Sequence, residues 1–338
     1  MMKKIENGAL MKKITLKDIA AELNVTVGTV SHVLNGVGDI SAVTRERVLE
    51  TAKRMGYISN SGAVALRQGK THTVAIIVPD ISNPHIAWQI KLMEAKLKQH
   101  GYSVVILNTN EEEGEENQAI VTACGKRVDG ILLCPVQTGT GNLDFLDRLE
   151  IPYILIGRSF PGRDVDYVTA DDLEAGYLAG RYLLEKGCVW PLYVGAHSYI
   201  ESSCHRFAGL QRAYAEGGIR LPEDRFLELS PEAGRAGSMI REGYAHFPTH
   251  DALVAFSDLM AFELLALGKD RGVPVIGFDA IGTHLPLPVS YASVGMVGDG
   301  WSEAAVSALL GKMNGKREPC RIRVAVELLE FGQGSTEK

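Results

Sequence analysis

The feature that most constrains the fold of this chain is a regular alternation of short apolar runs with helical segments after residue 70. The run Thr73–Val78 is apolar and rich in β-branched residues, which is typical of a strand buried on both faces of a sheet. A helix is expected over residues 84–99, and a strand over residues 102–107. Further strands are expected at Gly130–Cys134, Tyr153–Ile156, Leu192–Val194, Leu253–Phe256 and Val275–Ile276. Because strands that alternate with helices form parallel, doubly wound sheets, residues 71–338 are predicted to have an α/β fold.

An acidic stretch from Glu111 to Glu116 is expected to open another helix of this region. Carboxylates are stabilised at a helix N-terminus, because the helix dipole is positive there. We therefore interpret the stretch as the solvated start of a helix and not as a metal site, and we expect no cofactor.

The first sixty residues have a different, all-helical pattern. Thr15 is expected to cap a first helix that ends at Leu23, and Thr26 a second one that ends at Asn35. Ser41 is expected to cap a third helix, Ala42–Met55. Its inward-facing residues are predicted to be Val43, Val48 and Ala52.

Three short helices with a tight turn between the first two form a helix-turn-helix unit. The first turn of the second helix carries only small residues, from Thr26 to Thr29. Such a helix suits the major groove of DNA, where short side chains let the backbone approach the bases. A three-helix bundle that binds no nucleic acid has the same pattern, so this alternative stays open here.

Charge and composition narrow the class of protein. Residues 1–70 carry 11 Lys and Arg against 6 Asp and Glu, whereas residues 71–338 carry 24 against 35. A basic end on an acidic body suggests that this end meets a polyanion. With 46% hydrophobic and 22% charged residues, the chain is neither disordered nor fibrous. No apolar run reaches the 18 residues of a membrane span, and five scattered cysteines indicate reduced thiols, so we expect a cytoplasmic protein without a membrane partner.

The run Ile14–Asn35 strongly resembles the N-terminal signature of the lac repressor/purine repressor family of bacterial transcription factors. Thr44–Val48 and Met55–Tyr57 also fit the pattern of this family. The resemblance implies a homodimeric DNA-binding regulator, most often a repressor, on a near-palindromic operator. It also implies an all-α helix-turn-helix domain followed by an α/β domain of two lobes, similar to periplasmic sugar-binding proteins, which holds a small-molecule effector.

The resemblance also implies which residues contact DNA. Those of the helix-turn-helix unit are Thr15, Thr26, Val27, Gly28, Thr29, Ser31, His32 and Asn35. Val27, Gly28 and His32 occupy positions that usually read base edges. Because glycine has no side chain for a hydrogen bond, part of the readout must pass to His32 or to a neighbouring threonine. Thr15, Ser31 and Asn35 are expected to contact phosphates or to cap helices.

A hinge is expected between the two domains. In the family, a segment like residues 60–70 forms a short helix on operator DNA and inserts a leucine into the minor groove. Here Leu66 is the expected wedge and Arg67 the expected backbone contact. The helix-turn-helix domain is then residues 11–59, and residues 1–10 are an extension without hydrophobic periodicity.

The landmarks of the effector domain recur along residues 71–338, with lobe crossings expected near residues 160 and 285. The candidate effector-binding residues are His85, Arg158, Arg206, Ser257 and Asp279. A carboxylate with several donors suits a neutral sugar, whereas a second guanidinium suits a carboxylate or phosphate. With Arg158 and Arg206 both present, a sugar acid or sugar phosphate is ranked slightly ahead of a plain sugar.

Two other classes of protein compete with this hypothesis. A solute-binding protein without a DNA function would have a signal peptide and no helix-turn-helix unit, and the sequence fits neither expectation. An enzyme is disfavoured because no phosphate-binding glycine motif and no G-x-S-x-G motif occurs.

Overall fold

The computed structural model describes residues 14–58, 69–230, 235–267, 272–285 and 289–332. The chain divides into two compact units, residues 1–69 and 70–338. The expectations for residues 1–10 and for the hinge residues Leu66 and Arg67 therefore lie outside the described residues.

The first unit holds three helices: α1 (Leu16–Leu23), α2 (Val27–Leu34) and α3 (Ala42–Arg54). The three predicted N-caps are confirmed. Thr15 and Asp18 form a reciprocal capping box, the Thr26 hydroxyl accepts the Thr29 N–H at 3.0 Å, and the Ser41 hydroxyl accepts the Thr44 N–H at 3.2 Å. The core of the unit consists of Ile19, Ala20, Val30, Val33, Val48 and Ala52.

The prediction that Val43 faces inward is wrong, because its side chain is 69% exposed. The buried face of α3 is formed by Val48, Thr51 and Ala52, at the spacing of one helical turn. Val43 precedes Val48 by five residues, which turns it about 140° away from this face.

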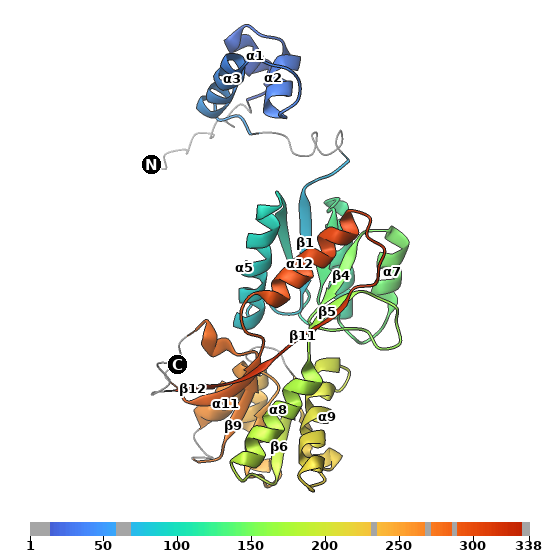
Figure 1. Ribbon diagram of the computed structural model, residues 1–338, viewed down its shortest axis with the longest axis vertical. Coiled ribbons are helices and arrows are strands. Elements are labelled where there is room, and N and C mark those ends of the chain that lie inside the picture. The colour runs from blue at the N-terminus through green and yellow to red at the C-terminus, as the bar shows by residue number, and fades with distance from the viewer. Residues whose placement is uncertain (1–13, 59–68, 231–234, 268–271, 286–288, 333–338) are drawn as a thin grey trace, which may run out of the picture. The chain divides into compact units, whose positions relative to one another are not determined.

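The second unit contains two six-stranded sheets, one in each of two lobes (Figure 1). Lobe 1 has the order β11-β5-β4-β3-β1-β2, and every described pairing in it is parallel. Its strands are β1 (Thr73–Val78), β2 (Ser103–Asn108), β3 (Gly130–Leu133), β4 (Tyr153–Ile156), β5 (Tyr167–Ala170) and β11 (Arg321–Val324).

Lobe 2 has the order β12-β10-β9-β8-β6-β7, in which β12 runs antiparallel to β10. Its strands are β6 (Pro191–Gly195), β7 (Phe226–Glu228), β8 (Ala252–Ala255), β9 (Val275–Phe278), β10 (Tyr291–Gly295) and β12 (Glu327–Phe331). The expected doubly wound α/β architecture is thus confirmed in both lobes.

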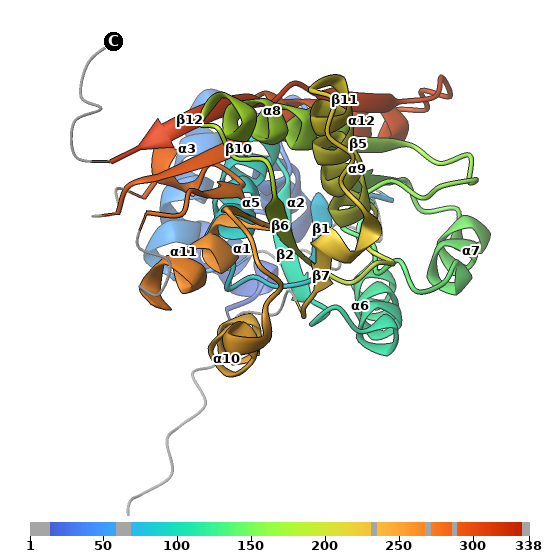
Figure 2. The ribbon, with the colours of Figure 1, turned by 90° about the horizontal axis from the view of Figure 1, so that it is seen from below.

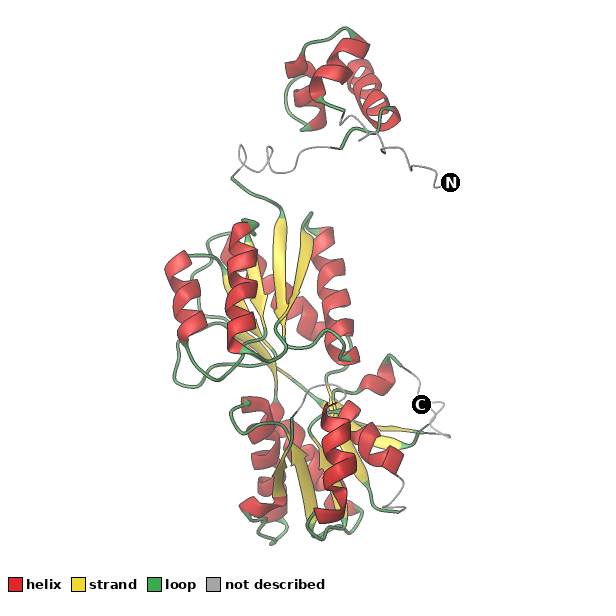
Figure 3. Cartoon of the chain, turned by 180° about the vertical axis from the view of Figure 1, so that it is seen from behind, coloured by secondary structure: helices red, strands yellow, loops and turns green. Residues whose placement is uncertain are grey.

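Helices cover both faces of each sheet (Figure 3). The helices of lobe 1 are α5 (Pro84–Gln99), α6 (Glu113–Gly125), α7 (Gly141–Leu149) and α12 (Gly300–Met313). Those of lobe 2 are α8 (Asp172–Glu185), α9 (Glu201–Glu216), α10 (Arg235–Gly243) and α11 (Asp258–Leu267). No helix among the described residues is long and apolar enough to cross a membrane.

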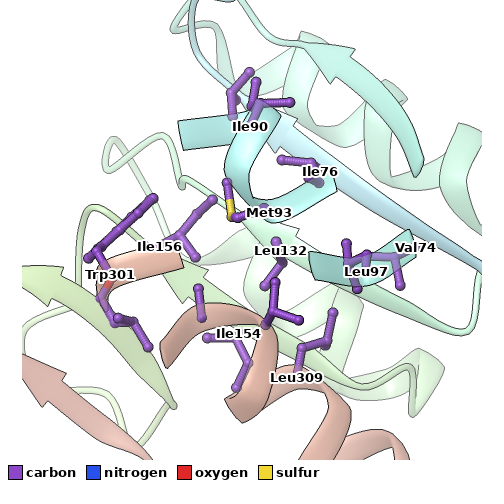
Figure 4. Close-up of a cluster of buried hydrophobic side chains, with 14 of the residues drawn as sticks. Val74, Ile76, Ile90, Met93, Leu97, Leu132, Ile154, Ile156, Trp301 and Leu309 are labelled. Carbon is purple, nitrogen blue, oxygen red and sulfur yellow. The ribbon is translucent and has the colours of Figure 1, made fainter. Parts of the chain in front are cut away.

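The core of lobe 1 joins segments that are far apart in sequence. Met93 and Leu97 of α5 and Leu309 of α12 pack over the same face of the sheet, against Ile76 and Leu132 (Figure 4). These five side chains are buried, and a buried side chain of this size contributes roughly 1.5–3 kcal/mol. The C-terminal helix α12 is therefore part of the lobe that the chain enters first.

The chain passes between the lobes three times. The passages lie between β5 and α8, between β10 and α12, and between β11 and β12. Two crossings were predicted from the sequence, near residues 160 and 285. The third was not predicted, because no strand was expected over residues 321–331, where β11 and β12 lie in different sheets.

Helices α8 and α9 cross each other (Figure 2). Two glycines allow them to approach closely at the crossing. A Cβ on Gly176 would lie 1.8 Å from the Arg206 carbonyl oxygen, and one on Gly209 would lie 2.0 Å from the Leu173 carbonyl oxygen. Only glycine fits at such a crossing. The contact brings the start of α8, with Asp172, beside Arg206 of α9.

Candidate DNA interface and effector cleft

The outward face of α2 carries the residues expected to contact DNA. Val30 and Val33 point into the core of the first unit, so the opposite side of the helix is exposed. The exposed residues on this side are Thr26, Val27, Gly28 and His32, and Val27 is 40% exposed. The sequence therefore placed its candidate base readers on the accessible side of the helix.

Several polar groups on this face already have partners within the unit. The Thr26 hydroxyl bonds the Thr29 hydroxyl at 2.9 Å besides capping the helix. The Asn35 amide donates to the carbonyl and the hydroxyl of Ser31. The capping role expected for Thr15 is confirmed.

A cavity of about 600 Å³ lies between the lobes of the second unit. Its walls include residues directly after the carboxyl ends of β1, β3 and β4 in lobe 1 and of β8 and β9 in lobe 2. Ligands of open α/β sheets bind at such strand ends. All five candidate effector residues line this cleft: His85, Arg158, Arg206, Ser257 and Asp279.

Arg158 is held by a carboxylate of its own chain. Its two terminal nitrogens donate to the two carboxylate oxygens of Glu111 at 2.6 and 2.8 Å, and Nη1 also donates to the Pro135 carbonyl at 2.9 Å. The side chains of Arg158 and Glu111 are only 9% and 8% exposed. The prediction of a solvated acidic stretch is therefore wrong for Glu111, which supplies the counter-charge of a buried guanidinium.

Glu116 departs from the same prediction. It lies on α6, is 1% exposed, and accepts the Val136 N–H at 2.6 Å and the Asn142 amide at 2.9 Å. Burial raises the pKa of this carboxyl to about 7, because the charged form loses its hydration. Helical periodicity explains its position, since Ala119, Ile120 and Ala123 are the other buried residues of α6.

Arg206 is also paired within the chain. Its Nε donates to Asp172 at 2.8 Å and its Nη1 to the Phe256 carbonyl at 2.6 Å. The guanidinium carbon lies 5.1 Å from the Phe256 ring centroid and 4.6 Å from that of Phe278. The planar group is thus held by two rings and a carboxylate at the wall of the cleft.

Asp279 follows β9 and has a left-handed φ of 105°. Burial raises the pKa of its carboxyl, while His85 and Arg206 act in the opposite direction. Asp279 lines the cleft, where its carboxylate can accept hydrogen bonds from hydroxyl groups. A non-glycine residue in this conformation stores strain, which is common at ligand sites.

Asp258 was not predicted from the sequence. It stabilises the loop that follows Asp279 by hydrogen bonds. Its carboxylate accepts the Ile281 N–H at 2.8 Å and the Ser293 hydroxyl at 2.6 Å. Burial, together with the nearby Asp279, raises its pKa to about 8. The neighbouring Ser257, which is a predicted ligand, lines the cleft, and its hydroxyl accepts the Met260 N–H at 3.3 Å.

His85 is the second residue of α5, and its backbone N–H donates to the Asn83 side chain at 2.9 Å. Its Nδ1 atom is buried, and among the described residues it has no hydrogen-bond partner. The ring lines the cleft, so a bound hydroxyl can complete this hydrogen bond.

The two lobes also touch outside the cleft lining. Glu201, the first residue of α9, accepts the N–H and the hydroxyl of Ser159 at 2.8 and 2.6 Å, and its own N–H donates to Gln137 at 2.9 Å. Elsewhere along the lobe boundary, the Trp88 ring stacks on His284 with centroids 4.3 Å apart. Neither contact had a sequence signal.

The charges around the cleft argue against the expected preference for an acidic effector. Both guanidinium groups are matched by carboxylates, Arg158 by Glu111 and Arg206 by Asp172. Asp279 adds a further carboxylate to the wall. An anion would have to compete with these buried pairs, whereas hydroxyl groups can use the remaining hydrogen-bonding positions.

Comparison with known families agrees with both units. Residues 15–60 match the family of bacterial regulatory proteins, lacI family, and residues 71–307 match the periplasmic binding proteins and sugar binding domain of LacI family. Over 283 residues the chain is 30% identical to the HTH-type transcriptional regulator DegA of Bacillus subtilis strain 168, covering 79% of this chain and 82% of DegA.

Two solved structures illustrate the similarity. The transcriptional regulator CelR in complex with cellobiose has a TM-score of 0.67 and 26% identity, covering 94% of this chain and 98% of CelR. The lac repressor dimer bound to operator and the anti-inducer ONPF has a TM-score of 0.80 over the same shares of the two chains, at 18% identity, which shows the fold. Because the sequence relatives are regulators, the alternative of a solute-binding protein without a DNA function is rejected.

Proposed function

Because this chain belongs to the LacI family of bacterial regulatory proteins, and is therefore a DNA-binding transcriptional regulator, we propose that an uncharged carbohydrate in its interlobe cleft controls its operator affinity. The protein acts as a homodimeric repressor in the cytoplasm, on a near-palindromic operator. The observation that carries the effector class is the pairing of both cleft arginines with carboxylates of the same chain.

The volume of the cleft is large enough for a ligand of more than one sugar ring. Drug-sized ligands occupy pockets of roughly 300–1,000 Å³, and this cleft holds about 600 Å³. CelR, with its bound cellobiose, provides a disaccharide as a first probe. The Asp279 carboxylate can accept hydrogen bonds from sugar hydroxyl groups, and a hydroxyl group can pair with the buried Nδ1 atom of His85. The two arginines, held in place by their carboxylate partners, can donate to sugar oxygens.

On the DNA side, the outward residues of α2 enter the major groove, with His32 as the hydrogen-bonding reader. Leu66 and Arg67 of the hinge add minor-groove and backbone contacts. In this proposal the lobes adopt two arrangements that differ in operator affinity. Effector binding changes operator affinity because the effector binds one arrangement more tightly than the other.

A thermal-shift panel tests the effector class on the full chain. Cellobiose, maltose and glucose are compared with glucuronate and glucose 6-phosphate at equal concentration. A ligand that binds only the folded state raises its stability by RT ln(1+[L]/Kd), so a neutral sugar is expected to raise the melting temperature. A shift with the two anions alone would contradict the proposal.

Asp279→Asn links any shift to the cleft. This variant keeps the size of the side chain but weakens its acceptance of hydroxyl groups, so the shift with the neutral sugar should shrink. Glu318→Gln, which changes an exposed carboxylate of a surface ion pair, serves as the control. An equal shift in Asp279→Asn would place the binding site elsewhere.

A further inference from the structure

Gly28 is a glycine that the fold of its own unit does not require. It is the second residue of α2, is exposed, and lies in helical backbone. A Cβ at this position would meet only the Thr26 hydroxyl oxygen at 3.5 Å, which is an ordinary contact. Glycine in a helix is less stable than alanine, because it loses more conformational freedom on folding.

The glycines that follow α2 have reasons within the unit. Gly36 and Gly38 have φ values of +67° and +88°, a region that other residues rarely adopt. A Cβ on Gly38 would also lie 3.2 Å from Nδ1 of His32. Gly28 has neither a positive φ nor a crowded Cβ position. The reason for a glycine at this position therefore lies in the binding of another molecule and not in the fold of the unit.

The neighbour of Gly28 is an exposed apolar residue. Val27 is 40% exposed, whereas Val30 and Val33 of the same helix are buried. The adjacent hydroxyls of Thr26 and Thr29 are engaged with each other and with the helix N-terminus. The first turn of α2 therefore presents methyl groups beside bare backbone.

We propose that Val27 and Gly28 form an apolar reading surface for thymine, defined here as the Val27–Gly28 surface. The missing side chain at Gly28 lets the first turn of α2 approach the base edges closely, and the Val27 methyl groups pack on the C5-methyl group of a thymine. The major groove exposes this methyl group, and apolar side chains recognise it. The inference rests on the operator contact proposed for α2.

The first test is Gly28→Ala in the full-length protein, because it predicts opposite effects on folding and on binding. Operator duplexes are first selected by the wild-type protein from a randomised pool. Backbone amides of residues 27–35 should exchange about two- to fivefold more slowly in the variant, since alanine stabilises the helix. Affinity for the selected duplex should nevertheless fall about fivefold or more, the size of a lost base-pair contact.

Gly114→Ala is the matched control. Gly114 is the second residue of α6, it is exposed, and a Cβ there would meet nothing within 4 Å. This variant should leave duplex affinity unchanged. Unchanged or improved affinity in Gly28→Ala would overturn the proposal.

The second test removes one methyl group from the DNA. Each thymine of the selected duplex is replaced in turn by deoxyuridine, which lacks only the C5-methyl group. One symmetric position in each half-site should lose about fourfold in affinity, the effect of one buried methyl-sized group. In Val27→Ala this sensitivity should disappear, and its persistence, or the absence of any sensitive position, would overturn the proposal.

Failure of this inference is distinguishable from failure of the proposed function. If wild-type protein selects no duplex, the operator contact itself is wrong. If it selects a duplex, but neither Gly28→Ala nor the replacement of thymines changes the affinity for that duplex, only the Val27–Gly28 surface is wrong.

Discussion

At the scale of single residues, the cleft is organised by buried charges that the chain itself neutralises. Arg158 donates to Glu111 and to the Pro135 carbonyl, and Arg206 donates to Asp172 and to the Phe256 carbonyl, before any effector binds. Removing one member of a buried ion pair leaves the other charge without compensation, which costs roughly 3–5 kcal/mol. Alanine at such a position would therefore mix a loss of binding with a loss of stability.

Arg206→Lys separates these two effects. Lysine keeps the positive charge beside Asp172 but loses the planar fork and the stacking between the rings of Phe256 and Phe278. We expect operator binding to persist and affinity for the neutral sugar found in the panel to fall about tenfold or more, as measured by titration calorimetry. Arg163→Lys, in a two-carboxylate pair away from the cleft, is the control.

Glu116 makes stability dependent on pH. Its pKa is raised from 4.5 to about 7 in the folded chain, so the folded state binds the proton more tightly than the unfolded state. Stability should fall as pH rises from about 4.5 to 7 and should then level off, by as much as about 3 kcal/mol. In Glu116→Gln this part of the fall should be absent from urea unfolding curves measured at successive pH values, and an identical profile would contradict the assignment.

At the scale of elements, the geometry of the cleft depends on how closely two helices cross. Helices α8 and α9 meet at Gly176 and Gly209, and this crossing sets the distance between Asp172 and Arg206. Helix α9 also begins with Glu201, which binds Ser159 of lobe 1. Helix α9 thus carries both Arg206, which lines the cleft, and a contact between the lobes.

Gly209→Ala tests the crossing. Its Cβ would lie 2.0 Å from the Leu173 carbonyl, which belongs to backbone and cannot rotate away, so the helices must separate. Overpacking of this kind costs roughly 1–3 kcal/mol, and the displaced Arg206 should also bind the neutral sugar more weakly. Chemical denaturation and calorimetry measure the two effects, and Gly114→Ala is the control. Unchanged values would show that the helices are free to adjust.

The hinge element gives a prediction that concerns DNA alone. Leu66→Ala removes the proposed minor-groove wedge, whose proposed role concerns DNA and not the effector. Affinity for the selected operator should fall at least about tenfold, because the bent DNA loses its apolar packing, while sugar binding stays unchanged. Fluorescence anisotropy and calorimetry compare the two, and normal operator affinity would overturn the hinge assignment.

At the scale of the whole molecule, the two ends of the chain differ in charge. Residues 1–70 carry an excess of basic side chains, and the rest carries an excess of acidic ones. A basic unit gains affinity for DNA by releasing counterions, whereas an acidic body limits non-specific contact.

This asymmetry predicts the salt response. The logarithm of the affinity for the selected duplex should fall linearly with the logarithm of salt concentration, and a loss of about 10³-fold or more between 50 and 200 mM would correspond to six or more phosphate contacts. The selected sites should be near-palindromes, because a two-fold dimer reads two half-sites. Equal affinity for all duplexes, or no salt dependence, would contradict this picture.

The sequence by itself determined the features that depend on near neighbours. The caps at Thr15, Thr26 and Ser41, the strands around Ile76 and Ile154, and the position of candidate ligands after strand ends all follow from patterns within a few residues. Even Asp279 could be placed in this way, because a residue that follows a parallel strand lies at the ligand-binding edge of its sheet.

Only the tertiary structure decided which distant groups meet. Arg158 and Glu111 are 47 residues apart, and their pairing changed the expected effector from an acid to a neutral sugar. The contact of Glu201 with Ser159, the burial of Glu116 and the separate sheets of β11 and β12 depend in the same way on the packing of whole elements. Local sequence patterns predict which face of its own helix or strand a side chain lies on. Its charge partners come from distant segments, which only the folded chain brings near.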